Sequence, residues 1–462
     1  MKWGRVGKGL LALGVAASAA WFGTCAYFSA ASPGVAFSRE ELAERPPAWP
    51  SGFLWGTATA AHQVEGGNRN DWSRFEETPG RIAGGERSGL AVDHWNRMAE
   101  DVALMAALKA NAYRFSIEWS RVEPEEGRWD EAAWGRYGEL LRLLSEARVT
   151  PMVTLLHFSL PIWMADRGGI AAPDFPDRFA RFAGEAARRF GAQVELWCVL
   201  NEPNVQMYLG YVTGIWPPGK KSPSEAVEAA AGLLRAHAKG AKAVRGASSR
   251  AKVGVAMNLA DFQPASRWSL PDWIATRGAA SSFDWAFYDS IAAGRVRFDS
   301  PGFPKVDEAL ADLAGSADWF GANYYTRNLV HFSPTEPGLV ALREGPREQT
   351  DLKWEIYPEG LLTLLRTASA RYKLPIYVTE NGIADAKGDK RGPYIRSHAH
   401  ALSRAIGEGI PVRGYFYWSL MDNFEWAEGF APRFGLYGVD YATLARIPAE
   451  GSEAFRDLAP SR

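Results

Sequence analysis

The stretch LWCVLNEP, residues 196–203, decides the fold class of this chain. It is a short apolar run, rich in aromatic and branched side chains, that a proline cuts off, which is the pattern of a buried strand. The stretch IYVTENG, residues 376–382, repeats this pattern and is cut off by a glycine. Each run places a glutamate, Glu202 or Glu380, where the strand meets a turn. Both carboxylates are therefore expected on the loop side of a sheet.

Six further segments have the same strand-like character, and helical patterns separate them. The eight strand candidates are residues 53–57, 112–119, 150–156, 196–200, 252–257, 319–325, 376–379 and 414–418. The helical patterns include residues 98–109, 131–147, 176–190, 224–245, 360–372 and 394–409. Alternation of β and α predicts a parallel sheet, and eight units predict an α/β fold of the (β/α)8 TIM-barrel type across residues 51–462. An open doubly wound sheet is the competing architecture, but the Gly-rich phosphate turn that usually follows its first strand is absent from the sequence.

The composition argues against several classes of protein. The chain has 462 residues, a formal net charge of −1 and no stripe of Lys and Arg with interleaved aromatics, so we expect no nucleic-acid partner. Two cysteines suggest neither a disulfide framework nor a metal cluster, and no His, Asp and Glu residues have metal-ligand spacing. No G-x-S-x-G elbow occurs. We therefore expect neither a metal site nor a serine nucleophile. The 19 Trp residues fit a carbohydrate site, although most are expected in the core.

The N-terminal segment differs in composition from the rest of the chain. Three basic residues precede an uncharged stretch from Gly9 to Ser38, and its most apolar part, Leu10 to Phe28, is long enough to span a bilayer. We predict a transmembrane anchor over residues 1–30, a linker over residues 31–50 and a catalytic domain outside the cytoplasm. The alternative is a signal peptide that is cleaved near Ala31, which would leave a secreted enzyme.

Most of the predicted strands deliver a polar or aromatic side chain to the same rim of the barrel. In a TIM barrel this rim, at the carboxyl ends of the strands, carries the active site. A single His or Asn at a strand end usually forms hydrogen bonds with its neighbours and has no further role. Polar or aromatic residues at the ends of this many strands are hard to explain by chance. The positions are Gln63, Arg114, His157, Asn201, Glu202, Asn258, Asn323, Tyr325, Glu380 and Trp418.

Two carboxyl groups at one rim can break a glycosidic bond, one as the proton donor and the other as the nucleophile. One must be protonated at working pH and the other ionised, so their environments must push the two pKa values apart. Arg114 is a candidate cation that keeps Glu380 ionised, and Tyr325 is a candidate hydrogen-bond donor to it. The alternative for Arg114 is a structural ion pair with Glu118.

Four motifs, in this order, resemble the retaining β-glycosidases of glycoside hydrolase family 1, and the resemblance covers about nine-tenths of the chain. They are FLWGTATAAHQVEG at residues 53–66, NEP at 201–203, TENG at 379–382 and YWSLMDNFEW at 417–426. The resemblance implies a (β/α)8 barrel, a glycoside substrate and no cofactor. It implies that Glu202 is the general acid/base and Glu380 the nucleophile. It further implies that the sugar is held by Gln63, His157, Asn201, Trp418, Glu425 and Trp426.

Two features depart from the common family pattern. Phe158 follows His157 where many members have Trp, and the N-terminal hydrophobic segment is unusual in the family. The segment and the stretch HFSLP at residues 157–161 are similar to those of a plant envelope galactosyltransferase of the same family. The leading hypothesis is a retaining β-glycosidase that removes terminal, unphosphorylated β-linked sugars. The alternatives are a membrane-associated transglycosylase with a glycolipid or saccharide acceptor, and a carbohydrate-binding protein that has lost catalysis.

Overall fold

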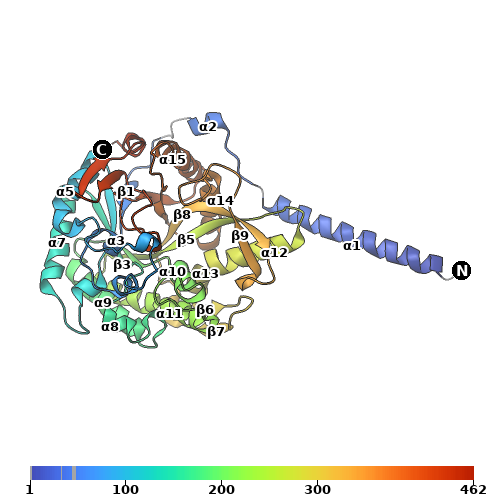
Figure 1. Cartoon of the computed structure of the whole chain (residues 1–462), viewed down its shortest axis with the longest axis horizontal. Coiled ribbons are helices and arrows are strands. Elements are labelled where there is room, and N and C mark those ends of the chain that lie inside the picture. Colours follow the sequence, from blue (N-terminus) through green and yellow to red (C-terminus); the bar gives the residue numbers. More distant parts are fainter. Residues whose placement is uncertain (1–2, 33, 44–47, 462) are drawn as a thin grey trace.

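The computed structural model describes residues 3–32, 34–43 and 48–461, and its main body is a closed barrel of eight parallel strands. Each strand pairs with the next, and the ring closes because β11 pairs with β1 and β8 pairs with β10. Figure 1 shows the helices around this ring. The barrel strands are β1 (Leu54–Ala58), β2 (Ala112–Ser116), β3 (Thr150–Leu156), β4 (Leu196–Asn201), β5 (Lys252–Pro264), β8 (Trp319–Phe332), β10 (Ile376–Asn381) and β11 (Val412–Trp418). The predicted (β/α)8 architecture is confirmed.

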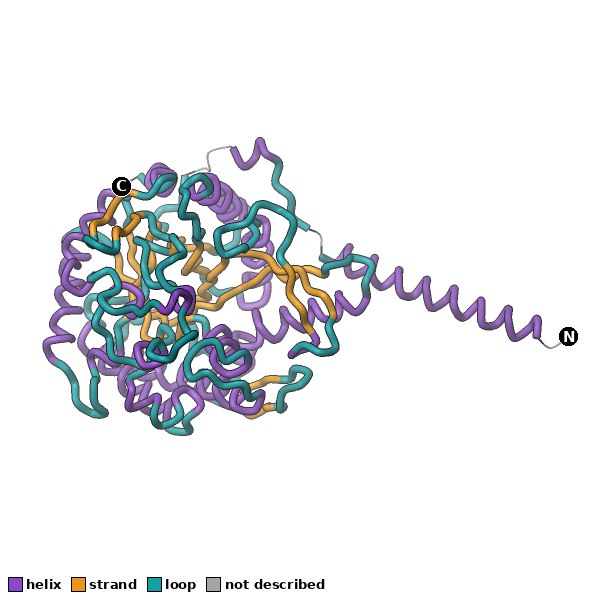
Figure 2. Tube along the Cα trace, in the orientation of Figure 1, coloured by secondary structure: helices purple, strands orange, loops and turns teal. Residues whose placement is uncertain are grey.

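The longer helices follow the strands in turn and surround the barrel, as the tube in Figure 2 shows. They are α5 (His94–Ala107), α7 (Glu131–Glu146), α9 (Phe175–Phe190), α11 (Pro223–Ala247), α13 (Ala286–Ala293), α14 (Pro358–Tyr372) and α15 (Arg391–Gly407). Short helices lie in the loops: α3 (Ala61–Val64), α4 (Asp71–Phe75), α6 (Trp119–Val122), α8 (Ile162–Ala165), α10 (Pro203–Met207) and α16 (Glu453–Asp457). Two small hairpins, β6 (Arg295–Phe298) with β7 (Val306–Ala309) and β12 (Tyr437–Asp440) with β13 (Ala445–Pro448), complete the loops.

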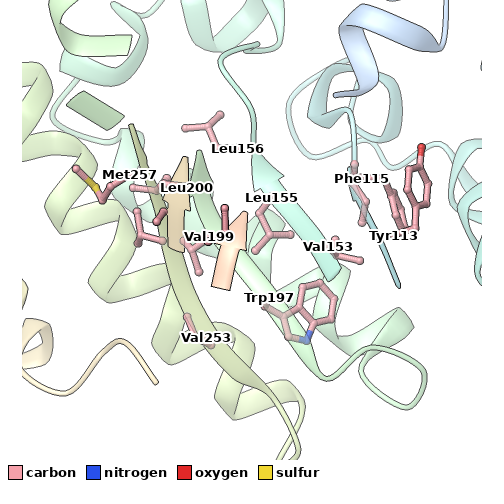
Figure 3. Packing of buried hydrophobic residues seen from close by; sticks show 14 of the residues in the cluster. Tyr113, Phe115, Val153, Leu155, Leu156, Trp197, Val199, Leu200, Val253 and Met257 are labelled. Atoms are coloured by element: carbon pink, nitrogen blue, oxygen red, sulfur yellow. The ribbon is translucent and has the colours of Figure 1, made fainter. Parts of the chain in front are cut away.

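Alternation along the strands divides the core into two layers. Outward residues such as Tyr113, Val153 and Val199 pack against the helices, and Figure 3 shows this layer. The residues between them point into the barrel, which places Arg114, Thr154 and Cys198 in mutual contact inside it. The alternation of side chains along β2 therefore directs Arg114 into the barrel.

The second strand is shorter than predicted. The sequence pattern extends it to Trp119, but β2 ends at Ser116. The reason is that α6 begins at Trp119, and the Glu118 side chain caps it by accepting from the Ser120 backbone N–H.

Two other strands are much longer than predicted and build an extension at the rim. β5 and β8 continue side by side beyond the barrel, where β9 (Val340–Arg343) adds to β8 in antiparallel orientation. Helix α12 (Leu270–Ala279) packs on this extension through Ala275 and Ala279, which contact Val330 and Val340. The extension thus forms a wall on the barrel rim, beyond the carboxyl end of β4.

The N-terminal segment forms a long helix, α1 (Trp3–Ala31), that projects away from the barrel in Figure 1. Its stretch Leu10–Ala31 has a mean hydropathy of 1.5 and is almost wholly exposed, so by length and composition it could cross a membrane. Its C-terminal end contacts the body of the protein near α12. Phe28 packs against Trp273, and the Arg277 guanidinium lies 4.2 Å from the centre of the Phe28 ring.

Part of the predicted linker is docked on the barrel. It contains a short helix, α2 (Arg39–Ala43), in which Glu41 forms an ion pair with Arg404. Further along, Trp49 donates a hydrogen bond from Nε1 to the Leu458 carbonyl at 2.7 Å. Residues 1–2 of the predicted anchor and residues 33 and 44–47 of the predicted linker lie outside the described part of the chain. The domain boundaries stay a prediction.

Candidate active site

Glu202 lies immediately after β4 and is held by two amides. Its Oε1 accepts from Asn323 Nδ2 at 2.8 Å and from Asn258 Nδ2 at 3.0 Å. Its backbone has left-handed angles (φ 43°, ψ 57°), which are costly for a residue with a side chain, and the Glu202 N–H to Ala256 carbonyl bond at 2.7 Å stabilises them. Burial raises its pKa to about 8, and the negative charge of Glu380 contributes to this shift.

Glu380 lies near the end of β10 and has a charged partner. Its Oε1 accepts from Arg114 Nη1 at 2.5 Å, and its Oε2 accepts from the Tyr325 hydroxyl at 2.7 Å. Burial raises the pKa of Glu380, whereas Arg114 and Tyr325 oppose that shift. No cation among the described residues contacts Glu202, so protonation of Glu202 is favoured over protonation of Glu380. The turn after Glu380 requires Gly382, because a Cβ there would collide with the Trp418 carbonyl oxygen.

Arg114 does not pair with Glu118. The Glu118 carboxylate instead accepts from the hydroxyls of Ser120 and Ser159. Arg114 uses its second terminal nitrogen to donate to Asn201 Oδ1 at 2.6 Å, and it also donates to the Thr379 carbonyl. Its guanidinium therefore connects the ends of β4 and β10, which carry the two glutamates.

Asn201 joins the charged pair to the next predicted residue, His157. The Asn201 amide contacts His157 Nε2 at 3.1 Å. Burial, with a smaller contribution from Arg114, lowers the pKa of His157 well below its usual value, so the ring is neutral. His157 Nδ1 is buried and has no hydrogen-bond partner in the described part of the chain, which leaves it free to bond to a substrate hydroxyl.

A second group of predicted residues lies across the site. Gln63 Nε2 donates to Glu425 Oε2 at 3.3 Å and to Asn423 Oδ1 at 2.9 Å. Its Oε1 is buried and has no hydrogen-bond partner among the residues that the structure describes. Burial, followed by the charge of Glu380, raises the pKa of Glu425 to about 8. The rings of Trp418 and Trp426 stack beside His157 at 5.8 Å and 6.0 Å. These contacts bring both groups of residues to one site.

The sequence pattern missed some roles at this site. Asn258 and Asn323 were recognised as rim residues only, but the paired register of β5, β8 and β10 aligns Asn258 with Asn323 and Asn323 with Glu380. This row supplies both amides that contact Glu202. Asn381, also at the rim, points elsewhere and bonds to Tyr394 and Tyr415.

Aromatic side chains close one side of the site. Phe158, which departs from the common family residue, lies 4.8 Å from Trp216 and 5.2 Å from Trp426 between ring centres. Trp216 was not singled out from the sequence, because this residue lies in a loop and loops have no hydrophobic periodicity that would mark it. Within the described ranges, no group of three or more His, Cys, Asp or Glu residues could hold a metal ion.

Comparison with known proteins identifies the family. The profile of glycosyl hydrolase family 1 matches residues 46–462. The chain belongs to glycosyl hydrolase family 1. It is 36% identical over 423 residues to β-glucosidase A of Thermotoga maritima, covering 86% of this chain and 95% of that protein. It is 34% identical to β-glucosidase 47 of Arabidopsis thaliana, covering 91% of this chain and 86% of that protein.

Solved structures of this family have the same fold. The Thermotoga maritima β-glucosidase in complex with castanospermine matches with a TM-score of 0.84 and 34% identity, covering 90% of this chain and 99% of that one. The same enzyme with deoxynojirimycin matches with a TM-score of 0.83, 34% identity and coverage of 90% and 100%. As a member of family 1 the protein is an O-glycosyl hydrolase that acts on β-glycosides.

Proposed function

We propose that the protein is a retaining β-glycosidase in which Glu380 is the nucleophile and Glu202 the general acid/base. The observation that carries this proposal is the difference between the two buried carboxylates. Glu380 contacts the Arg114 cation, whereas the amides of Asn258 and Asn323 donate to Glu202, whose pKa is raised to about 8. Near neutral pH this arrangement favours one ionised and one protonated carboxyl group, which is what the reaction needs.

The reaction proceeds in two steps. Glu202 donates its proton to the glycosidic oxygen as the bond to the anomeric carbon breaks, and a Glu380 oxygen forms an ester to that carbon. After the aglycone leaves, the Glu202 carboxylate removes a proton from water, the water oxygen attacks the anomeric carbon, and the ester to Glu380 breaks. Two inversions give net retention.

The sugar is proposed to lie between the two groups of polar side chains. The unpartnered Nδ1 of His157 and Oε1 of Gln63 are suited to its hydroxyls. Asn201 is proposed to bond to the 2-hydroxyl, and Trp418 to lie against the sugar ring. Glu425 is proposed to bond to the 4- and 6-hydroxyls, and above its pKa of about 8 its carboxylate would repel a 6-phosphate.

The stereochemical outcome tests this proposal. The full-length protein, in a detergent without a sugar headgroup, is incubated with aryl β-glucoside, β-galactoside and β-fucoside, and the first-formed anomer is followed by ¹H NMR. The account predicts the β-anomer. The α-anomer as first product would exclude Glu380 as a nucleophile.

Helix α1 supports a proposal about location and favours a second candidate function. We infer that Leu10–Ala31 anchors the protein in a membrane with the barrel outside the cytoplasm; the alternative is a cleaved signal and a secreted enzyme. An anchored enzyme meets glycolipids, which could replace water as acceptors in the second step. The test is to measure the amounts of free sugar and of sugar transferred to lipid, with and without glycolipid vesicles. Free sugar indicates hydrolysis, and transferred sugar indicates transglycosylation.

A further inference from the structure

An apolar pocket adjoins Glu202. Its volume is about 260 Å³, and aliphatic and aromatic side chains form most of its lining, including Phe262, Phe283 and Val340. One of its few polar members is Asn258, whose side-chain amide donates to Glu202 Oε1 at 3.0 Å. The pocket is therefore one residue away from the carboxyl group that would protonate the leaving oxygen.

One wall of the pocket comes from the extension of β5 and β8, together with β9 and α12, and the rest comes mainly from α11 and the segment around β6. Phe262 belongs to the extended part of β5 and Val340 to β9, and both pack with Ala279 of α12 in one small cluster. Ala279 lines the pocket, while Trp273 and Arg277 of the same helix contact Phe28 of α1. Helix α12 thus connects the pocket with the base of the hydrophobic N-terminal helix.

Some exposed apolar side chains lie on the elements that form this part of the surface. Outside α1, the large hydrophobic residues that stand exposed in the described chain include Trp268, Ile274 and Leu342. Trp268 precedes α12 and Ile274 lies within it, while Leu342 of β9 lines the pocket and is 51% exposed. Such a concentration of apolar surface beside an apolar pocket is typical of a site that receives an apolar ligand.

We propose that this pocket binds the hydrocarbon aglycone of an amphiphilic β-glycoside. The inference rests on the proposed function, because it places the sugar at Glu202 and Glu380 and the hydrocarbon chain beyond Asn258. The entrance near Leu342 and the position of α1 beside α12 suit a substrate that is presented from a membrane surface. A second saccharide unit is a poor fit, since the lining offers few groups to bond to its hydroxyls.

Binding of non-hydrolysable S-alkyl β-thioglucosides, from methyl to octyl, tests this proposal without requiring turnover. The full-length protein is placed in phosphatidylcholine nanodiscs, and dissociation constants are measured by calorimetry with empty nanodiscs subtracted. The affinity should rise by about four-fold per methylene while the chain enters the pocket, and then level off. An affinity that does not change with chain length would overturn the proposal.

Two matched variants locate the effect. Leu342→Asp should reduce the gain from methyl to octyl by at least ten-fold, because it places a charge in the pocket entrance. Ile447→Asp changes a residue that is 56% exposed on β13 and lies outside the pocket, so it should leave the gain unchanged. Equal losses in both variants would contradict the assigned site.

A parallel assay of octyl β-glucoside turnover separates the two proposals. Binding that depends on chain length without any hydrolysis would refute the proposed function and keep the pocket. Hydrolysis of methyl and octyl β-glucoside with equal kcat/KM and equal affinity would refute the pocket and keep the function.

Discussion

Replacing Arg114 by methionine should change the pH dependence of the first chemical step. Arg114 Nη1 lies 2.5 Å from Glu380 Oε1, and both side chains are buried. Removing one member of such a pair costs about 3–5 kcal/mol if the other stays charged. Since one pKa unit corresponds to about 1.4 kcal/mol, the pKa of Glu380 should rise by about two to four.

The sign of the effect follows from the carboxylate's role. A nucleophile must be ionised, so a raised pKa removes activity at pH values below it and leaves the activity at higher pH. We expect the acidic limb of the pH profile to move upward by about two units or more, and activity near pH 6 to fall on the order of a hundred-fold. Activity should recover in part as the pH rises.

The assay is kcat/KM for dinitrophenyl β-glucoside as a function of pH. This leaving group needs no proton, so the acidic limb reports the ionisation of Glu380 rather than that of Glu202. Arg114→Lys retains the positive charge and is the matched control, for which a smaller shift is expected. A Met variant with an unchanged acidic limb and a uniformly lower rate would show that Arg114 acts only by supporting the fold, and would refute the reasoning.

Three further predictions concern the acid, the sugar and the anchor. Glu202→Ala should lower kcat/KM for alkyl β-glucosides by about 10²–10⁴ but affect dinitrophenyl β-glucoside far less, and equal losses would count against Glu202 as the acid. Above pH 8, where Glu425 is ionised, wild-type enzyme should prefer a β-glucoside over its 6-phosphate, and Glu425→Gln should reduce the ratio of the two kcat/KM values; a preference for the phosphate would exclude the proposed contact. Cell fractionation with sequencing of the mature N-terminus should find detergent-requiring protein that retains Leu10–Ala31, whereas soluble protein beginning near residue 32 would show a cleaved signal.

The barrel and most of its rim were predictable because both depend on local periodicity. Short apolar runs define the strands, and a parallel α/β topology brings all their carboxyl ends to one side. Glu202, Glu380 and their neighbours could therefore be placed at one site before any contact was known. The family resemblance added the assignment of roles, which strand ends alone do not provide.

Features that depend on register or on loop packing were not predictable. The two amides that contact Glu202 come from Asn258 and Asn323, and their alignment requires the pairing of β5 with β8. The extension of β5 and β8 beyond the barrel is stabilised by contacts with β9 and α12, so no local pattern marks where those strands end. The apolar pocket depends on this extension and was absent from the sequence-based interpretation for the same reason.

The most direct test of the central claim is to trap the covalent intermediate with an activated 2-deoxy-2-fluoro β-glucoside and locate the label by peptide mass spectrometry. The fluorine slows both steps, and a good leaving group allows the ester to form and persist. The account predicts one sugar per protein molecule, attached to the peptide that contains Glu380. A label on any other residue, or an enzyme that is active on aryl β-glucosides but never acquires the label, would contradict the assignment of Glu380 as the nucleophile.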